Sequence, residues 1–180
     1  ENTPEGKTLI LMSSKRIIEQ MFIDFTESLE AKGVTMICQG MSGGQNRMEA
    51  EFIASKAPAI WLLTPWMYEG TELPPGTLDR AVLESLPFDH PNQPIMQRRN
   101  DHYKNSFTEY AMPRVEHRLF RLLRTFCRHR KEGGEMIVLD KRIHEKDYGR
   151  KLRSFMERFG SEDGGTPKKP NGDRVQPSLF

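Results

Sequence analysis

Short apolar runs alternate with amphipathic segments along most of this chain, and the alternation limits the fold more than any other feature. Runs of four or five apolar residues are typical of buried strands, and apolar residues three or four apart are typical of helices. Strands alternating with helices predict an α/β fold with a doubly wound, mainly parallel sheet flanked by helices. The predicted strands are 9–12, 34–38, 59–63, 80–84 and 136–139, and the predicted helices are 15–32, 46–55, 95–107, 113–129 and 148–159.

The chain has 180 residues, enough for one domain with a sizeable core. We expect residues 1–159 to form that domain. Residues 160–180 are rich in Gly, Pro, Lys, Asp and Ser, which predicts a flexible, disordered C-terminal tail. The chain starts in a polar stretch without an initiator Met, so we expect it to be a piece of a longer protein.

Composition excludes several classes of function. The formal net charge is +2, so overall charge indicates no partner. Cys38 and Cys127 lie far apart in apolar surroundings, which favours reduced thiols and a cytoplasmic location. The five histidines lack ligand spacing, so we predict no metal site. No apolar run approaches the ~20 residues of a membrane span, so we expect no membrane partner.

Three polar loops follow predicted strands, and parallel strands bring such loops to one edge of the sheet. The first holds Ser13, Ser14 and Lys15, where a serine can cap the next helix. The second begins at Gln39 and Gly40 and continues as a glycine-rich stretch whose backbone N–H groups could meet a phosphate. The third, 64–72, contains an acidic turn, Glu69-Gly70-Thr71-Glu72. A connecting role is the ordinary alternative for each loop.

A "GKT" triplet at Gly6-Lys7-Thr8 does not predict a P-loop. That motif needs a glycine five residues earlier, where this chain has Glu1, and a helix directly after the triplet. Here a strand follows. The main phosphate cradle of any nucleotide site must therefore lie elsewhere.

The segment 113–131 carries the strongest physical signal. Its apolar residues form one helical stripe, and a second stripe on the opposite side contains only arginines. Seven Lys/Arg and one Glu give this segment a local charge of +6. Planar guanidinium groups suit phosphate oxygens, so we interpret the second stripe as a phosphate-contacting face and not merely a solvated one. Its members are Arg114, Arg118, Arg121, Arg124 and Arg128.

These pieces in this order resemble the second RecA-like lobe of superfamily 2 helicases of the DinG/XPD type, over about residues 7–155. "TLILMSSKRIIEQMF" is similar to the opening strand, loop and helix of that lobe. "TPWMYEGTELPPG" and the following "LPFDHPNQP" resemble motif V and its continuation, with Glu72 in place of the family's Asp. "GGEMIVLDKRIHEKDYGRKL" resembles the closing strand. The residues that match the family pattern are Glu69, Gly70, Leu86, Pro87, Phe88, Pro91, Pro94, Asp140, Arg142, Tyr148 and Gly149.

Motif VI is where the chain departs from the family pattern Gln-Gly-x-Gly-Arg-x-x-Arg. The ungapped overlay, which we prefer at this point, lays the motif on 121–128, matches only Arg128 and puts Thr125 at the arginine-finger position. Arg124 could substitute for the finger. A shifted overlay from His117 recovers Arg121 and Arg124 but requires four extra residues afterwards. The departure implies inefficient ATP hydrolysis or a divergent branch, such as the CRISPR-associated DinG-like helicases.

The resemblance implies the C-terminal motor lobe of an ATP-dependent nucleic-acid helicase that unwinds DNA 5′→3′. ATP and Mg²⁺ would be shared with a first lobe of the same polypeptide, any iron–sulfur cluster would lie outside this chain, and the isolated lobe would be inactive. The substrate would be single-stranded DNA or a duplex with a 5′ tail. The implied residues are catalytic Arg121, Arg124 and Arg128, cofactor-binding Glu69, Gly70 and Glu72, and nucleic-acid-binding Ser13, Ser14, Lys15, Gln39 and Gly40.

Two further interpretations stay open. One is a catalytically degenerate RecA-like module that binds nucleic acid or protein, including a CRISPR effector complex. The other concerns Gln176-Pro177-Ser178-Leu179-Phe180, which resembles the peptide that docks bacterial replication proteins on the sliding clamp. Short motifs of this kind suit a flexible tail.

Overall fold

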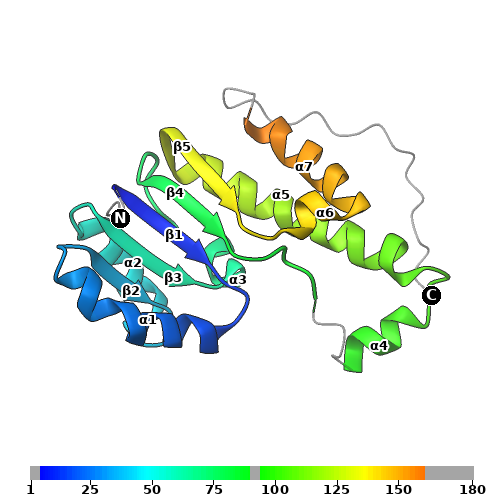
Figure 1. Ribbon diagram of the computed structural model, residues 1–180, viewed down its shortest axis with the longest axis horizontal. Helices are drawn as coiled ribbons and strands as arrows, with labels where there is room; N and C mark the ends of the chain where they lie inside the picture. Colours follow the sequence, from blue (N-terminus) through cyan, green and yellow to red (C-terminus); the bar gives the residue numbers. More distant parts are fainter. Residues whose placement is uncertain (1–4, 90–93, 161–180) are drawn as a thin grey trace.

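All five predicted strands are present and form one sheet in a computed structural model that describes residues 5–89 and 94–160. The strand order is β2-β3-β1-β4-β5, and every neighbouring pair is parallel. Helices flank the sheet (Figure 1), which confirms the predicted RecA-like α/β fold. The strands are β1 (Lys7–Leu11), β2 (Thr35–Cys38), β3 (Ala59–Leu63), β4 (Leu78–Leu83) and β5 (Arg130–Val138).

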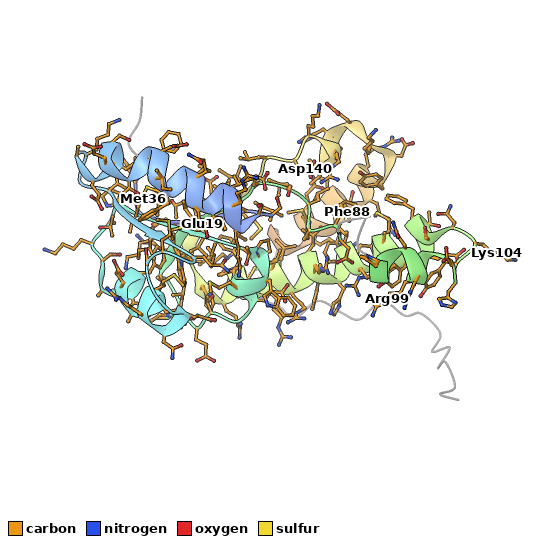
Figure 2. All side chains as sticks on the ribbon, turned by 90° about the horizontal axis from the view of Figure 1, so that it is seen from below. Glu19, Met36, Phe88, Arg99, Lys104 and Asp140 are labelled. Atoms are coloured by element: carbon orange, nitrogen blue, oxygen red, sulfur yellow. The ribbon has the colours of Figure 1, made fainter. Side chains whose placement is uncertain are left out.

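Two apolar cores lie on opposite faces of the sheet because side chains alternate along each strand. Helix α1 (Lys15–Glu30) packs on one face, where Ile18 lies against Ile60 and Leu62 of β3. Helices α2 (Gln45–Ala54), α5 (Met112–His129) and α7 (Asp147–Gly160) contribute to the larger core on the other face. Figure 2 shows α1 and α2 on opposite sides of the sheet. All five residues of β3 are buried, as its unbroken apolar run predicts.

Strand β5 begins at Arg130, six residues before the predicted start at residue 136. Its first half, Arg130-Lys131-Glu132-Gly133-Gly134, has no apolar residue, so hydrophobic pattern could not reveal it. This half lies at the sheet edge, where Arg130 pairs with Leu78 and the register then shifts before Arg80 pairs with Glu135. Edge strands tolerate charged residues because one side is open to water.

Several helix boundaries differ from the prediction. Helix α4 (Pro94–Asn100) is shorter than the predicted 95–107, and a π-helical turn η1 (Phe107–Ala111) leads directly into α5. Two short helices were not predicted: α3 (Pro65–Glu69) and α6 (Arg142–Glu145). Each is too short to show a helical repeat in the sequence. The predicted tail falls almost wholly on residues 161–180, which lie outside the described residues.

The start of α1 also corrects a detail. Ser14 occupies the N-cap position, but its side chain makes no capping hydrogen bond. Ser13 instead donates its backbone N–H and its hydroxyl to Glu84 Oε2, at 3.2 and 3.0 Å. The serine side chain that bonds in the loop after β1 therefore holds this loop to the end of β4 and does not cap the helix.

Asp140 joins the segments that follow β4 and β5. Its carboxylate accepts hydrogen bonds from the backbone N–H groups of Leu86 (2.8 Å) and Arg142 (3.0 Å) and from the Arg142 guanidinium. That guanidinium lies over the ring of Phe88, 5.1 Å from its centroid. Figure 2 labels Phe88 and Asp140 in this region. The family-like "LPF" and "LDKR" stretches thus form one structural cluster.

Within residues 5–89 and 94–160, no helix is long and apolar enough to cross a membrane.

Candidate functional site

The loops after β1, β2 and β3 meet at one edge of the sheet, here called the strand-tip edge (Ser13, Ser14, Lys15, Gln39 and Gly40 with the start of α3). Figure 1 shows α3 beside the arrowheads of β1 and β3. Gln39 is buried, and its Oε1 accepts a hydrogen bond from the backbone N–H of Thr64 at 2.8 Å. Gly40 has φ +96°, a conformation that favours glycine. All five predicted nucleic-acid residues thus lie at this edge, with Ser13, Lys15 and Gly40 exposed.

Helix α3 forms because the residues at its start satisfy the unpaired backbone N–H groups of its first turn. Thr64 Oγ1 accepts a hydrogen bond from Met67 N at 3.3 Å, and Pro65 stands at the first helical position. The helix buries Tyr68 completely and leaves Trp66 81% exposed. The first part of the predicted loop 64–72 is therefore a helix, which fixes the direction of Trp66, Tyr68 and Glu69 and ends where the acidic turn begins.

A cavity of about 430 Å³, here called the tip cavity, lies between the strand-tip edge and α5. Glu69 of α3 lines it and forms an ion pair with Arg121, Oε2 to a guanidinium nitrogen, at 2.8 Å. The Glu69 side chain is 9% exposed and that of Arg121 is 51% exposed. The cavity lining includes Lys15, Gln39, Gln45, Trp66, Gly70 and Arg121.

The charge of Glu69 is opposed by burial and favoured by its neighbours. Burial raises the pKa of Glu69, and the lowering influence of Arg121, Arg118 and His117 does not cancel this effect. The carboxylate is therefore held largely by the cations of α5. An anionic ligand that binds Arg121 would compete with Glu69 for the guanidinium. Glu69 would then keep only the weaker influence of Arg118 and His117 on its charge.

A second cavity, of about 570 Å³, lies on the other side of the acidic turn and is here called the side cavity. Glu69 and Gly70 line both cavities, whereas Glu72, Arg128 and His129 line only this one. Arg128 lies seven residues along α5 from Arg121, about 10 Å away at 1.5 Å per residue. The three predicted cofactor residues therefore stand between two cavities, each with one arginine of α5.

The arginine stripe of α5 is divided between two roles. Arg114 and Arg118 bind Asp89, and Arg118 also donates to the carbonyl oxygen of Pro87 at 2.8 Å. Burial alone would raise the pKa of Asp89, but the hydrogen bonds from these two arginines outweigh it and hold the pKa below its usual value. These two arginines therefore fasten the segment after β4 to α5. Arg121, Arg124 and Arg128, the three predicted catalytic residues, are exposed.

Thr125 is buried, although it lies only about one turn of α5 after Arg121. It is 5% exposed, on the buried side of α5 with Leu122 and Phe126. The ungapped motif VI overlay thus puts the finger position in the core, where a guanidinium could not reach a ligand. The shifted overlay puts both of its arginines, Arg121 and Arg124, on the exposed edge.

Beneath the acidic turn, Tyr68 and His129 form a buried pair that the sequence did not indicate. The Tyr68 hydroxyl lies 3.4 Å from His129 Nδ1, and the rings meet edge to face. Burial, with a smaller effect from Arg128, lowers the pKa of His129 to about 4. Burial also raises the pKa of Tyr68. The pair fixes α3 against the C-terminal end of α5 and requires a neutral imidazole.

This pair predicts a pH dependence of stability. In the unfolded chain His129 takes up a proton near pH 6.5, whereas in the folded protein it does so near pH 4. The unfolded state then binds more protons between these values, so the free energy of unfolding should fall as the pH drops through this window. We expect His129→Gln to flatten the slope by about 1 kcal/mol per pH unit between pH 6 and 4.5. Denaturant unfolding at several pH values measures both slopes, and identical slopes would contradict the prediction.

Among the described residues, no group of three or more His, Cys, Asp or Glu side chains could hold a metal ion. Glu69 is engaged by Arg121, and Glu72 is exposed in the side cavity.

An all-parallel sheet with its polar loops gathered at the strand tips, beside an arginine-edged helix, is the architecture of a RecA-like α/β lobe. The chain belongs to the helicase C-terminal domain family, whose model matches residues 1–159. It is the C-terminal lobe of a DinG-type superfamily 2 helicase.

Curated relatives agree with this assignment. The chain is 25% identical over 152 residues to the "3'-5' exonuclease DinG" of Bacillus subtilis, covering 81% of this chain and 16% of that protein. It is 26% identical over 167 residues to the "ATP-dependent helicase DinG" of Mycobacterium tuberculosis, covering 89% of this chain and 24% of that protein. It is 25% identical over 109 residues to the "ATP-dependent DNA helicase DinG" of Photobacterium profundum, covering 58% of this chain and 16% of that protein. The chain thus spans between a sixth and a quarter of these relatives.

Proposed function

We propose that this chain is the motor lobe that completes the ATP site of a 5′→3′ DNA helicase. A first lobe of the same polypeptide supplies the P-loop and the ligands of Mg²⁺, and any iron–sulfur cluster lies outside this chain. The strand-tip edge holds single-stranded DNA or the 5′ tail of a duplex. The exposed arginines of α5 and the acidic turn face the triphosphate. The proposed location is the cytoplasm.

The observation that carries the proposal is the Glu69–Arg121 ion pair. Glu69 ends the helix that begins at the strand-tip edge, and Arg121 belongs to the arginine edge of α5. A movement of the arginine edge of α5 would therefore displace α3 and the strand-tip edge through this short, half-buried ion pair. Exchange of Arg121 from Glu69 to a phosphate is a physical route by which nucleotide binding reaches the nucleic-acid loops.

We assign motif VI in the shifted register. Arg121 takes the finger position and Arg124 the second arginine position, both on the exposed edge of α5. The four extra residues are accommodated where α5 ends at His129 and β5 begins at once with a charged, glycine-containing segment. This assignment supports a hydrolytic role more strongly than the ungapped overlay, which uses the buried Thr125. Arg128, in the side cavity, is assigned to a supporting contact with the nucleotide.

The test is ATP turnover and strand separation by the two-lobed polypeptide, compared with the 180-residue chain alone. We expect DNA-stimulated hydrolysis and unwinding of a duplex with a 5′ tail only when both lobes are present. Activity of this chain alone would contradict the shared site. Unwinding of 3′-tailed duplexes only would contradict the proposed direction.

A catalytically degenerate module is the second candidate. It is favoured by the departures from motif VI, since His117 and Phe120 stand where the family has Gln and Gly. A relative named as an exonuclease also indicates that proteins containing such a lobe carry other activities. Complete lack of ATP turnover by the two-lobed protein, with nucleic-acid binding retained, would favour this candidate.

Recruitment also remains a proposal. Docking on the sliding clamp would use Gln176–Phe180, which lie outside the described residues. A pull-down with purified clamp, with and without these five residues, tests that contact, and equal recovery would end the idea. Association with a CRISPR effector complex would be examined by co-purification with such a complex.

A further inference from the structure

Trp66 is the most exposed of the large apolar side chains in the described part of the chain, at 81%. The other tryptophan, Trp61, is completely buried in β3. Trp66 occupies the second position of α3, where Thr64 and Pro65 fix the helix start and the buried Tyr68 anchors its far side. An indole held on a rigid helix with its surface in water indicates a binding surface, because exposing it costs hydrophobic free energy.

The neighbours of Trp66 are polar and cationic. The indole lines the tip cavity together with Lys15, Gln39, Gln45 and Arg121. Lys15 and Arg121 supply positive charge, Glu69 of the same lining pairs with Arg121, and Gln39 and Gln45 supply amide groups. Docking surfaces for proteins place such anchors within apolar surroundings, whereas Met67 is the one other apolar side chain in the lining of the tip cavity.

An aromatic platform beside cations is the combination that binds single-stranded nucleic acid, since bases stack on the ring and phosphates meet the charges. We propose that Trp66 stacks on an unpaired base of the strand held at the strand-tip edge. Lys15, the first residue of α1, meets the phosphates on either side of that base. This inference rests on the proposed nucleic-acid function and adds a contact to the base faces. Stacking is sequence-tolerant because every base has a π-face, so the platform suits a protein that travels along a strand.

The experiment compares two strands of equal charge, a short oligothymidylate and an abasic oligomer of the same length, binding to the 180-residue chain at low salt. We expect Trp66→Ala to weaken oligothymidylate binding about tenfold and to leave binding of the abasic strand unchanged. Trp66→Phe should retain most of the affinity because the smaller ring still stacks. Uridine and thymidine strands, run side by side, distinguish RNA from DNA as the strand that is held.

Phe25→Ala is the matched control. Phe25 is a surface aromatic of α1, 48% exposed, and lies ten residues beyond Lys15, about 15 Å along the helix. Its replacement should leave both affinities unchanged. Intrinsic fluorescence gives an independent readout, because the chain has two tryptophans and only Trp66 is exposed. Oligothymidylate should quench the wild-type emission and leave that of Trp66→Phe unaltered.

Each other outcome decides against the proposal in a distinguishable way. Equal binding of the thymidylate and abasic strands, unaffected by Trp66→Ala, would overturn stacking and leave the proposed function standing. An equal loss for both strands would assign Trp66 to support of the backbone site. Quenching by an added first lobe, with none by the strand, would make Trp66 a lobe contact. Binding of no strand at all would refute the nucleic-acid function itself.

Discussion

Alanine in place of Arg121 is expected to lower kcat for ATP hydrolysis by the two-lobed helicase about 10³-fold, with little change in KM for ATP. An arginine finger acts on charge that develops on the transferred phosphoryl group, so its loss is felt in the transition state and only weakly in binding. Arg121 is suited to this role because its guanidinium is half exposed and is held in place by a single carboxylate, Glu69. Single-turnover hydrolysis measures the chemical step directly.

Arg114→Ala is the matched control for this prediction. Arg114 belongs to the same stripe of α5 but is bound to Asp89 at 2.7 Å. Its loss should lower stability slightly and leave kcat within a few-fold of wild type. Arg121→Lys should recover only part of the activity, since an ammonium group lacks the planar fork. Equal losses in Arg114→Ala and Arg121→Ala would mean that the stripe acts through general positive charge.

Asp140→Ala is expected to lower the free energy of unfolding by about 3 kcal/mol at neutral pH, the largest stability effect that we predict for a polar residue here. Asp140 is 8% exposed. Its removal leaves the backbone N–H of Leu86 and the guanidinium of Arg142 without their acceptor. The segments after β4 and β5 would then separate. Denaturant unfolding monitored by circular dichroism measures the change.

The same variant carries a pH signature. Burial alone would raise the pKa of Asp140, but hydrogen bonds from Arg142 and Leu86 hold it below the ordinary value of 3.8. A depressed carboxyl pKa contributes stability above the unfolded value, and this is lost as the pH falls through the folded value. The difference between wild type and Asp140→Ala should therefore be constant above about pH 5 and shrink below pH 3.8. Asp147→Ala, at a fully exposed side chain, is the control, and a pH-independent difference would contradict the assignment.

The sheet could be predicted because its central strands are hydrophobic on both faces. The apolar side chains from Ala59 to Leu63 are all buried only in a strand that is covered on both faces of the sheet. The structure gives this strand the same boundaries. The first half of β5 could not be predicted in this way, since its charged residues and glycines lie at an open edge. That part of the strand forms through backbone hydrogen bonds to β4, and the hydrophobic pattern of a sequence does not predict such hydrogen bonds.

The sequence predicted which loops and which helix form the candidate site, but not which of their side chains contact one another. Loops after parallel strands share an edge, so the grouping of Lys15 with Gln39 followed from topology. The ion pair between Glu69 and Arg121 depends on how α5 packs against α3, and a single sequence does not define that packing. Trp66 and His129 were missed for a related reason. Trp66 falls in the predicted loop 64–72, where the sequence gives no sign of its exposure, and His129 lies at a helix end whose burial depends on Tyr68.

Motif VI can be laid on this chain in two registers, of which we propose the shifted one. Both overlays assign arginines to one helix, and periodicity alone does not say which register is used. Burial separates them, because Thr125 faces the core while Arg121 and Arg124 face outward. The other two arginines of the stripe, Arg114 and Arg118, bind Asp89 and fasten the segment after β4 to α5.

The central claim is that the arginine edge of α5 faces the γ-phosphate of a nucleotide held by another lobe. An ATP analogue with a photoreactive group on the γ-phosphate, bound to the two-lobed protein and irradiated, tests this directly. Mapping of the labelled peptides by mass spectrometry should find the label within 121–128 or on the acidic turn 69–72. Labels confined to the first lobe, or placed on α1 or α7, would contradict the account.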